Sequence, residues 1–353
     1  IAKRVKRLTG FDRVMVYRFA SDWSGHVVAD EREAGMESYQ DLWYPASDIP
    51  SQARELYRTN LVRYIADVKY EAVPVLPRNP EAGQILDMSH ATLRSVSPVH
   101  IQYLKNMGVG SSLVMSIMRG DQLWGLISCH HREPTDLPMQ MRRACYSLSI
   151  TVSYMLNNLL LSQENESRSA IGKLCQEIES SFGKSHVGIE DIIEHTSGKL
   201  LQLGASGAGL FWKQGYIYPF GKWPSGVELD ALVDYAKQRL QASREDLFFE
   251  CALPPEVRKR APFERQLCGM AAINLDSFAS TGLLWIRPEH VQEVSWGGDP
   301  NKAVNAERDE RGRVQLSPRT SFAQWVQRVG NKSKAWGNME RFAITTLVGL
   351  KQT

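Results

Sequence analysis

The chain has 353 residues, of which 42 are Lys or Arg and 39 are Asp or Glu, giving a formal net charge of +3. This small and interspersed charge favours neither nucleic acid nor an anionic membrane as a partner, and we expect neither. With 43% hydrophobic residues the composition is globular, and the length exceeds what one hydrophobic core usually serves, so two domains are expected.

The cysteines and the apolar runs exclude further classes. The five cysteines are scattered and form no CxxC pair, so we expect neither a disulfide framework nor a zinc site. No apolar run is long enough to cross a bilayer, and the first residues, Ile1-Ala2-Lys3-Arg4, lack the apolar segment of a signal peptide. We therefore expect a cytoplasmic protein with reduced thiols.

The first half alternates strand and helix signals. Residues 13–19 are rich in β-formers and predict a strand, and residues 51–64 have the composition and charge pairing of a helix. Residues 109–118 and 122–131 predict two further strands, joined by a tight turn at Arg119-Gly120-Asp121. This order of elements indicates an α+β domain with a central hairpin.

A long helix and a second cycle of elements follow. The helix is predicted to begin after Pro138 and to continue towards Glu179. The apolar residues that recur at helical spacing are Leu148, Val152, Met155 and Leu159. Residues 190–202 then predict a helix and residues 208–212 a strand that ends at the turn Gln214-Gly215. The second domain is therefore expected to repeat the architecture of the first.

Residues 285–325 stand apart from this pattern. Gly297-Gly298-Asp299-Pro300 and a charged run at residues 307–313 interrupt any core periodicity, so we expect a long excursion outside the core. Trp296 and Trp325 near its flanks favour docking over disorder. Residues 339–350 return to a helical composition.

The motif Asp48-Ile49-Pro50 has two interpretations. It is compatible with a plain helix N-terminus that is capped by Ser47 or Asp48. Alternatively, Pro45 and Pro50 stiffen the stretch, so that main-chain carbonyls and a carboxylate are held at fixed positions facing a pocket. Rigid acceptors of this kind suit a ligand with several N–H donors.

A second polar motif runs through residues 94–103. If a helix starts after Pro98, His100 and Tyr103 share one face. A lone histidine on a helix is more often structural than ligand-binding, but the polar residues around His100 favour a pocket. Arg63 and Arg94 are surface residues by default, and they are also the side chains that a ligand with two carboxylates requires.

Metal chemistry and catalysis find little support. Cys129-His130-His131 suggests a metal, but alternation along a strand sends His130 and His131 to opposite faces, so no metal site is expected. The chain carries no G-x-S-x-G, H-E-x-x-H, Walker or kinase motifs, so we expect no enzyme activity within it.

Several motifs together closely resemble the phytochrome family. Those that resemble its GAF domain are Pro45-Ala46-Ser47-Asp48-Ile49-Pro50, Leu93-Arg94-Ser95-Val96-Ser97-Pro98-Val99-His100, Tyr103-Leu104-Lys105-Asn106-Met107-Gly108-Val109 and Trp124-Gly125-Leu126-Ile127-Ser128-Cys129-His130-His131. Those that resemble the tongue of its PHY domain are Trp296-Gly297-Gly298 and Pro318-Arg319-Thr320-Ser321-Phe322. The resemblance spans nearly the whole chain and implies the photosensory core of a bacteriophytochrome.

The resemblance implies a fold and a domain division. The fold would be α+β, with two tandem GAF-like domains, each an antiparallel sheet flanked by helices, joined by the long helix. Residues 1–160 would form the GAF domain, and residues 161–353 the PHY domain, with a tongue at about 285–326 and a C-terminal output helix.

The resemblance further implies a red/far-red photoreceptor that holds biliverdin IXα. The main-chain carbonyl of Asp48, in the motif that continues with Ile49 and Pro50, and His100 would lie near the pyrrole nitrogens. The residues implied to hold the propionates are Arg63, Arg94, Ser97 and Ser112. Those implied to border the rotating outer ring are Tyr17, Tyr44, Tyr103 and His130, while Met15 and Tyr57 would pack the cavity.

Trp296, Arg319 and Ser321 are the implied switch residues of the tongue. Arg319 would pair with Asp48 in the dark, so that rotation of the ring breaks a partly buried ion pair and lets the tongue refold. The signal would pass to an output module outside this chain, such as a histidine kinase with its response regulator. The long helices are expected to form a homodimer.

Two positions depart from the family pattern. Val99 occupies the place of the cysteine that attaches bilin in plant and cyanobacterial members, and bacteriophytochromes use a cysteine ahead of an N-terminal PAS domain. Ahead of Ile1 this sequence holds neither that domain nor its cysteine, so we expect either that they have been removed or that the pigment is bound noncovalently. Val114 replaces a serine of some relatives near a propionate, and it is left out of the expected site.

Two alternatives remain at the level of sequence. A GAF-type sensor of a cyclic nucleotide or another metabolite would use the same kind of pocket without photochemistry. A pure dimerisation and relay module would need only the apolar faces of residues 147–160 and 339–350.

Overall fold

The computed structural model describes residues 1–76, 86–92, 94–182, 189–204, 206–223, 228–243, 246–259, 267–276, 280–302, 304–308 and 314–350. Leu93, the first residue of the family motif at residues 93–100, and residues 309–313 of the predicted charged run lie outside these ranges. The chain divides into two compact units: unit 1 comprises residues 1–160 and 294–327, and unit 2 comprises residues 161–293 and 328–353. Among the described helices, none combines the length and the apolar composition that a membrane span requires.

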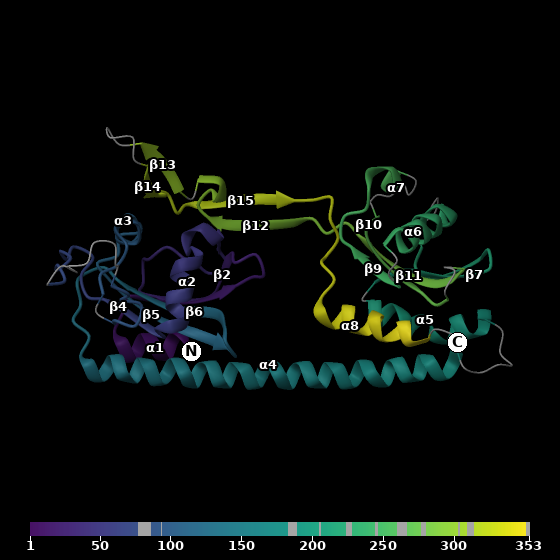
Figure 1. The fold of residues 1–353 in the computed structure, drawn as a ribbon, viewed down its shortest axis with the longest axis horizontal. Helices are drawn as coiled ribbons and strands as arrows, with labels where there is room; N and C mark the ends of the chain where they lie inside the picture. The colour runs from purple at the N-terminus through teal and green to yellow at the C-terminus, as the bar shows by residue number, and fades with distance from the viewer. Residues whose placement is uncertain are drawn as a thin grey trace. The chain divides into compact units, whose positions relative to one another are not determined.

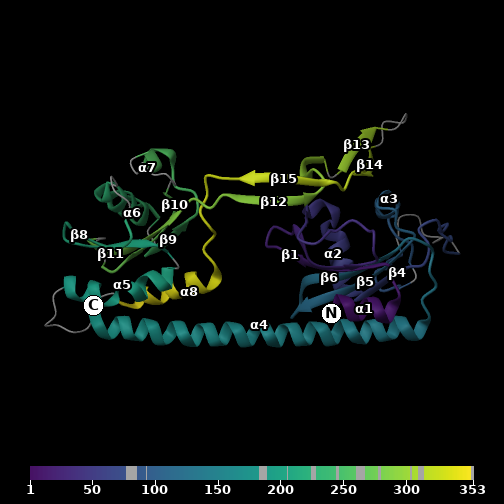
Figure 2. The ribbon, with the colours of Figure 1, turned by 180° about the vertical axis from the view of Figure 1, so that it is seen from behind.

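Unit 1 is built on a mostly antiparallel sheet in the order β15-β12-β3-β2-β1-β6-β5-β4, with helices on both faces (Figures 1 and 2). Its strands are β1 (Arg13–Phe19), β2 (Gly25–Arg32), β3 (Trp43–Tyr44), β4 (Val62–Ile65), β5 (Ser111–Arg119), β6 (Gln122–His131), β12 (Gln292–Gly297) and β15 (Gln324–Val329). Its helices are α1 (Ala2–Thr9), η1 (Ala46–Asp48), α2 (Ser51–Thr59), α3 (Pro98–Asn106), the first part of α4 (Met139–Phe182) and η2 (Pro300–Lys302). A separate two-stranded sheet joins β13 (Val304–Arg308) to β14 (Val314–Pro318).

Alternation along the strands produces two apolar faces. Val14 and Val16 of β1 pack with α1 and α4 on one face, whereas Met15 and Tyr17 point to the other. On β5, Val114 likewise faces away from its neighbours Leu113 and Met115. Both faces are covered, so β1 and β5 carry buried residues at successive positions along most of their length instead of at every second position. One face forms a closed core, and the other remains available for a site.

The predicted helix over residues 51–64 is too long. Helix α2 ends at Thr59, Asn60 adopts an extended conformation, and β4 begins at Val62. β4 pairs with β5, with Val62 opposite Met115. β-branched and aromatic residues favour this pleated, half-buried position, and the charge pairing that suggested a helix is confined to Glu55 and Arg58.

The long helix is confirmed, but the apolar residues that recur along it do not all lie on one buried face. Leu148 and Val152 of α4 pack against the sheet of unit 1. Met155 and Leu159, in contrast, are 58% and 61% exposed. The residues at helical spacing therefore belong to two faces, of which only one is covered in this chain.

Unit 2 repeats the architecture of unit 1, as expected. Its sheet has the order β8-β7-β11-β10-β9. In unit 1 the strands β2-β1-β6-β5-β4 follow the same order, if the five strands of each set are counted along the chain and the short strand β3 is left out. The strands are β7 (Ala208–Lys213), β8 (Tyr216–Gly221), β9 (Leu247–Glu250), β10 (Leu267–Asn274) and β11 (Thr281–Pro288). The helices are the rest of α4 with α5 (Ile189–Gly204), α6 (Leu229–Ser243), α7 (Pro255–Lys259), α8 (Asn338–Leu347) and η3 (Val348–Leu350). The fold class is therefore α+β with two tandem domains of one topology.

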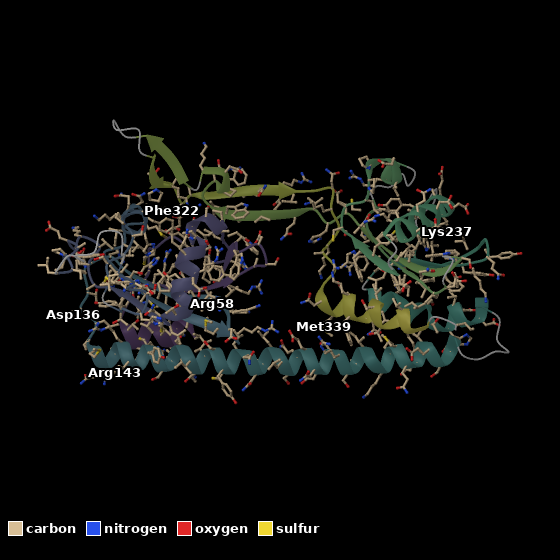
Figure 3. All side chains as sticks on the ribbon, in the orientation of Figure 1. Arg58, Asp136, Arg143, Lys237, Phe322 and Met339 are labelled. Carbon is tan, nitrogen blue, oxygen red and sulfur yellow. The ribbon has the colours of Figure 1, made fainter. Side chains whose placement is uncertain are left out.

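The excursion begins later in the chain than the predicted residue 285, because β11 continues to Pro288. Trp285 lies in β11 and is 0% exposed, and its indole Nε1 donates a hydrogen bond to the Leu200 carbonyl at 2.7 Å. Gly204 provides the room for the ring, because a Cβ there would lie 2.3 Å from Trp285 Cδ1. The tryptophan belongs to the core of unit 2. Phe322, at the other end of the excursion and labelled in Figure 3, is buried in unit 1.

We predict that Trp285→Ala destabilises unit 2 by about 3–5 kcal/mol, because a large core side chain and its hydrogen bond are lost. Hydrogen exchange of the β10 amides reports the free energy of opening of this unit. Trp325→Ala is the matched control, since Trp325 is only partly buried and belongs to unit 1. Equal exchange of β10 in the two variants would contradict the core assignment of Trp285.

Candidate functional site

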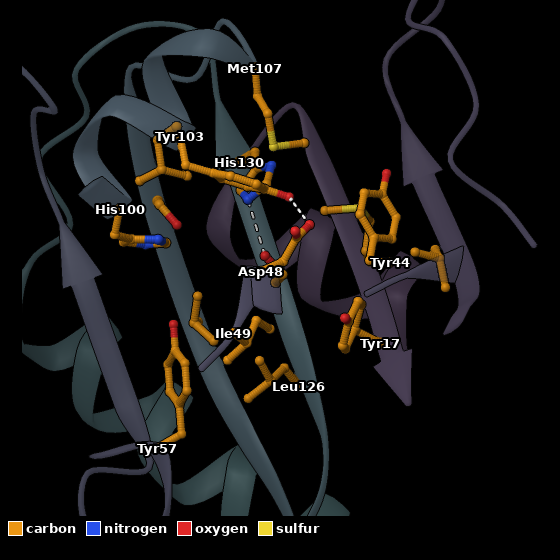
Figure 4. A pocket seen from close by; sticks show the side chains of 16 residues that line it. Tyr17, Tyr44, Asp48, Ile49, Tyr57, His100, Tyr103, Met107, Leu126 and His130 are labelled. Carbon is orange, nitrogen blue, oxygen red and sulfur yellow. Dashed lines mark hydrogen bonds between the residues drawn. The ribbon is translucent and has the colours of Figure 1, made fainter. Parts of the chain in front are cut away.

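The open face of the unit 1 sheet holds a largely apolar cavity that is partly open to solvent. Its floor is formed by strands β1, β5 and β6, and its rim by α2, α3 and the turn that contains Asp48. The lining residues are Met15, Tyr17, Val27, Tyr44, Asp48, Ile49, Tyr57, His100, Tyr103, Leu104, Met107, Ser112, Val114, Leu126, Ser128 and His130. Figure 4 shows Tyr17 and Tyr44 on one side of Asp48, and His100 and Tyr57 on the other.

A second cavity adjoins the first, since Tyr57 and His100 contribute to the walls of both. Its other polar residues include Arg63, Arg94 and Ser97. The two cavities together form an apolar chamber next to a cationic one.

The two arginines of the second cavity lack a carboxylate partner within the described part of the chain. Arg63 donates to the main-chain carbonyls of Thr92 and Arg94, and Arg94 donates to the carbonyl of Ala91 at 3.1 Å. Burial and the neighbouring Arg94 guanidinium lower the pKa of Arg63. Two adjacent guanidinium groups without counter-charge are suited to bind carboxylates in bidentate geometry.

His100 and His130 are neutral imidazoles at neutral pH. Burial, and secondarily Arg63, lowers the pKa of His100 to about 4. Burial followed by Arg13 and His100 lowers the pKa of His130 to about 3. His130 Nε2 lies 3.1 Å from Ser128 Oγ, and the ring of His100 stacks against Tyr103 with centroids 6.4 Å apart. A neutral imidazole retains one acceptor nitrogen, so each ring can accept a hydrogen bond from an N–H donor.

Asp48 is a buried carboxylate held from two sides. Arg319 Nη2 pairs with Asp48 Oδ2, and both side chains are almost fully buried, at 3% and 4% exposure. Tyr103 Oη donates to the same oxygen at 3.0 Å (Figure 4). Burial raises the pKa of Asp48, while Arg319 and Tyr103 oppose the shift. The ion pair with Arg319 that the resemblance implies is therefore present.

Further contacts fix the segment around Arg319 against the cavity rim. Phe322 meets the ring of Tyr103 edge to face at 5.1 Å between centroids. Asn106 Nδ2 donates to the main-chain carbonyl of Arg319 at 3.0 Å. In the neighbouring strands, Trp296 Nε1 donates to Gln327 Oε1 at 3.0 Å.

The tyrosines of the cavity are neutral phenols. Burial raises the pKa of Tyr57 to about 12, and it also raises the pKa of Tyr17, Tyr44 and Tyr103. The hydroxyl of Tyr44 and Asp48 Oδ1 are buried and have no hydrogen-bond partner among the residues that the structure describes. Buried polar atoms are normally satisfied, so these orphans indicate that a polar ligand fits the cavity.

The structure brings together nearly all the residues that the sequence predicts for the site. The predicted residues that line the first cavity are Met15, Tyr17, Tyr44, Asp48, Ile49, Tyr57, His100, Tyr103, Ser112 and His130. Arg63, Arg94 and Ser97 line the second. Pro50 instead precedes α2 and lines neither of these two cavities. Ser321 is exposed, and Arg319 is the residue of its motif that contacts Asp48.

Sequence reasoning missed several walls of the cavity. Val114 was left out of the expected site, yet it lines the cavity from β5 because it shares a face with Ser112. The other missed residues are Val27, Leu104, Met107, Leu126 and Ser128. Alternation would have found Leu126 and Ser128, which share a strand face with His130.

Two family models match this chain, and together they cover most of its length. The family model described as phytochrome region matches residues 172–350, and the model described as GAF domain matches residues 1–148. Cyanobacterial phytochrome B of Nostoc sp. is 37% identical over 341 residues, which cover 96% of this chain and 45% of that protein. The bacteriophytochrome of Pseudomonas aeruginosa is 36% identical over 354 residues, covering 96% and 46%. The chain thus spans about half the length of these curated relatives.

Solved structures give the same result. The crystal structure of bacteriophytochrome RpBphP3 from R. palustris matches with a TM-score of 0.79 and 33% identity, covering 99% of this chain and 69% of that chain. The photosensory core module of the Stigmatella aurantiaca phytochrome matches with a TM-score of 0.73 and 32% identity, covering 100% and 70%.

The lowered pKa of His130 predicts an acid-sensitive unit 1. Below pH 6.5 the unfolded chain takes up a proton at this position and the folded chain does not, so stability falls as pH falls towards 3. Between about pH 7.5 and about pH 5.5 this loss amounts to about 1.4 kcal/mol per such histidine. Hydrogen exchange of the β1 and β6 amides, measured at both pH values and corrected for the intrinsic exchange rate at each pH, gives the loss.

His130→Gln should lose about 1.4 kcal/mol less than the wild type over the same interval. The exposed His90 provides the matched control, and His90→Gln should behave as the wild type does. If the loss for His130→Gln equals that of the wild type, His130 is not a buried neutral imidazole.

Proposed function

Because the chain belongs to the phytochrome family, we propose that it is the sensory part of a red/far-red light photoreceptor that binds a linear tetrapyrrole, biliverdin IXα. The observation that carries the proposal is the apolar chamber with neutral acceptors next to two arginines that have no carboxylate partner among the described residues. A linear tetrapyrrole with two propionates has the complementary chemistry: a long apolar body, a row of N–H donors and two anions.

The residues of the chain divide this task. Arg63 and Arg94, with Ser97 and Ser112, bind the propionates. The main-chain carbonyl of Asp48 and the neutral His100 accept hydrogen bonds from pyrrole N–H groups. Tyr17, Tyr44, Tyr103 and His130 surround the outer ring, and Met15, Ile49 and Tyr57 exclude water. The bound pigment supplies absorption of red light and rotation of its outer ring.

The pigment is held noncovalently by the residues of this chain. None of the residues that line the two cavities is a cysteine, and Cys129 and Cys145 are buried away from them. Val99 stands on α3 next to His100 and offers no nucleophile.

Asp48 and Arg319 form the switch in this proposal. A ring that moves against Tyr103 and Tyr44 disturbs the hydrogen bond and the aromatic contacts around the ion pair. Removing one partner from a buried pair costs about 3–5 kcal/mol, which is enough to move the segment that carries Trp296, Arg319 and Ser321 to another conformation.

The wider context is also part of the proposal. Residues 1–160 act as the GAF domain and residues 161–353 as the PHY domain of a cytoplasmic protein, with no enzyme activity of their own. An output module with a response regulator receives the signal. The exposed apolar residues of α4, such as Tyr154 and Leu159 at 67% and 61% exposure, favour a homodimer through this helix.

A sensor of a cyclic nucleotide or metabolite is not favoured. Such a sensor needs the cavity but not the phytochrome region, which matches residues 172–350.

The test is to add biliverdin to the apoprotein and record absorbance before and after red light. We expect a red band that converts under illumination, and an unchanged spectrum of free pigment would contradict the proposal. Arg63→Met and Arg94→Met should each weaken the apparent affinity about tenfold or more, because each removes charge-assisted hydrogen bonds to a carboxylate.

Arg58→Met is the matched control for these arginines. Arg58 is an exposed residue of α2 that pairs with Glu55, and its loss should leave the affinity unchanged. If Arg63→Met and Arg58→Met bind biliverdin with equal affinity, the proposal that the second cavity binds the propionates is wrong.

A further inference from the structure

Tyr44, a wall of the cavity, rests on a glycine of the neighbouring strand. Strand β12 runs parallel to β3, with Trp296 opposite Trp43, so Gly297 takes the place beside Tyr44. A Cβ on Gly297 would lie 2.6 Å from Tyr44 Cζ and 2.7 Å from Cε1 and Oη. Real Cβ atoms essentially never approach another atom so closely, and the ring therefore lies where any side chain at residue 297 would have to be.

The same arrangement recurs two strands away. Tyr17 of β1 lies over Gly25 of β2, where a Cβ would come within 1.6 Å of Tyr17 Cζ. Gly25 is itself the register partner of Tyr44, and the rings of Tyr17 and Tyr44 are 6.2 Å apart. Two aromatic walls of the cavity thus each lie on a glycine of the next strand.

The two glycines differ in what holds them in place. Gly25 belongs to the β1-β2 hairpin, so its position follows from local chain connection. Gly297 belongs to the excursion, and it lies beside β3 only while β12 is docked. The next residue, Gly298, has φ +99, and a Cβ there would lie 3.0 Å from Arg319 Nη1. The glycine pair therefore contacts Tyr44 on one side and the switch arginine on the other.

The ring of Tyr44 depends on packing for its position. It is 5% exposed, and its hydroxyl has no hydrogen-bond partner in the described part of the chain. Its neighbours are the rings of Tyr17 and Tyr39, the guanidinium of Arg319 at 5.3 Å and the main chain of Gly297.

From these contacts we propose that Gly297 is a positioning residue for Tyr44: the docked strand β12 sets the place of this ring in the cavity wall through a steric contact that is separate from the Asp48–Arg319 ion pair. Undocking of β12 releases Tyr44, and displacement of Tyr44 towards residue 297 pushes β12 off β3. The coupling is reciprocal, as any coupling between two equilibria must be. It deepens the proposed function by giving the cavity a second link to the excursion.

The experiment uses the apoprotein, so its outcome does not depend on pigment binding or photochemistry. Hydrogen exchange is measured for the amides of residues 292–298 and of Trp43 and Tyr44. Gly297→Ala should accelerate exchange at these amides about tenfold or more, because overpacking forces either the strand or the ring to move. Combining it with Tyr44→Ala should return the exchange of residues 292–298 close to that of Tyr44→Ala alone, since the clashing ring is gone.

Gly172→Ala is the matched control. Gly172 lies in α4, and a Cβ there would meet nothing within 4 Å, so exchange in β12 should be that of the wild type. Unchanged exchange in Gly297→Ala would overturn the proposal. So would the same acceleration by Gly297→Ala with and without Tyr44, because the effect would then not pass through the ring. If Gly297→Ala fails to fold, recovery of the folded chain in the double variant supports the proposal and continued failure overturns it.

Discussion

One buried ion pair, Asp48 with Arg319, constrains the rest of unit 1. Its two residues are 271 positions apart, and one carboxylate oxygen receives both Arg319 and Tyr103. Desolvating two charges is costly, and the pair persists only because the surrounding contacts hold it in place. Phe322, Asn106 and Gly298 supply these contacts. The ion pair therefore couples the cavity wall to the excursion, so a conformational change in one alters the contacts of the other.

The two units have one topology and different chemistry. The strand order β2-β1-β6-β5-β4 in unit 1 corresponds to the order β8-β7-β11-β10-β9 in unit 2. In unit 1 alternation sends Val14 and Val16 to the closed core and Met15 and Tyr17 to the cavity. In unit 2 the central strand β10 is buried at every residue, and large side chains such as Trp285 and Trp212 fill the core. The repeated fold provides the scaffold, and the residues on the open face of the first sheet provide the site.

Local signals in the sequence predicted the elements that depend on local interactions. The hairpin β5-β6, the long helix α4 and the face shared by His100 and Tyr103 follow from periodicity and turn residues. The limits of α2 and the start of the excursion did not follow. Residues 62–65 are a strand because they pair with β5, about fifty positions away, and Trp285 is core because α5 leaves room for its ring. The motifs predicted most of the residues that line the two cavities, but the role proposed for Gly297 depends on a parallel strand pairing that the sequence does not reveal.

The most direct test of the ion pair as the link between pigment and excursion is light-dependent hydrogen exchange of residues 318–329 in the pigment-loaded protein. Asp48→Ala keeps the main-chain carbonyl that we propose as an acceptor for the pigment, and it removes the carboxylate that pairs with Arg319. We predict that light changes the exchange of these residues in the wild type and leaves it unchanged in Asp48→Ala, which should still bind pigment. A light-induced change of the same size in Asp48→Ala would contradict it.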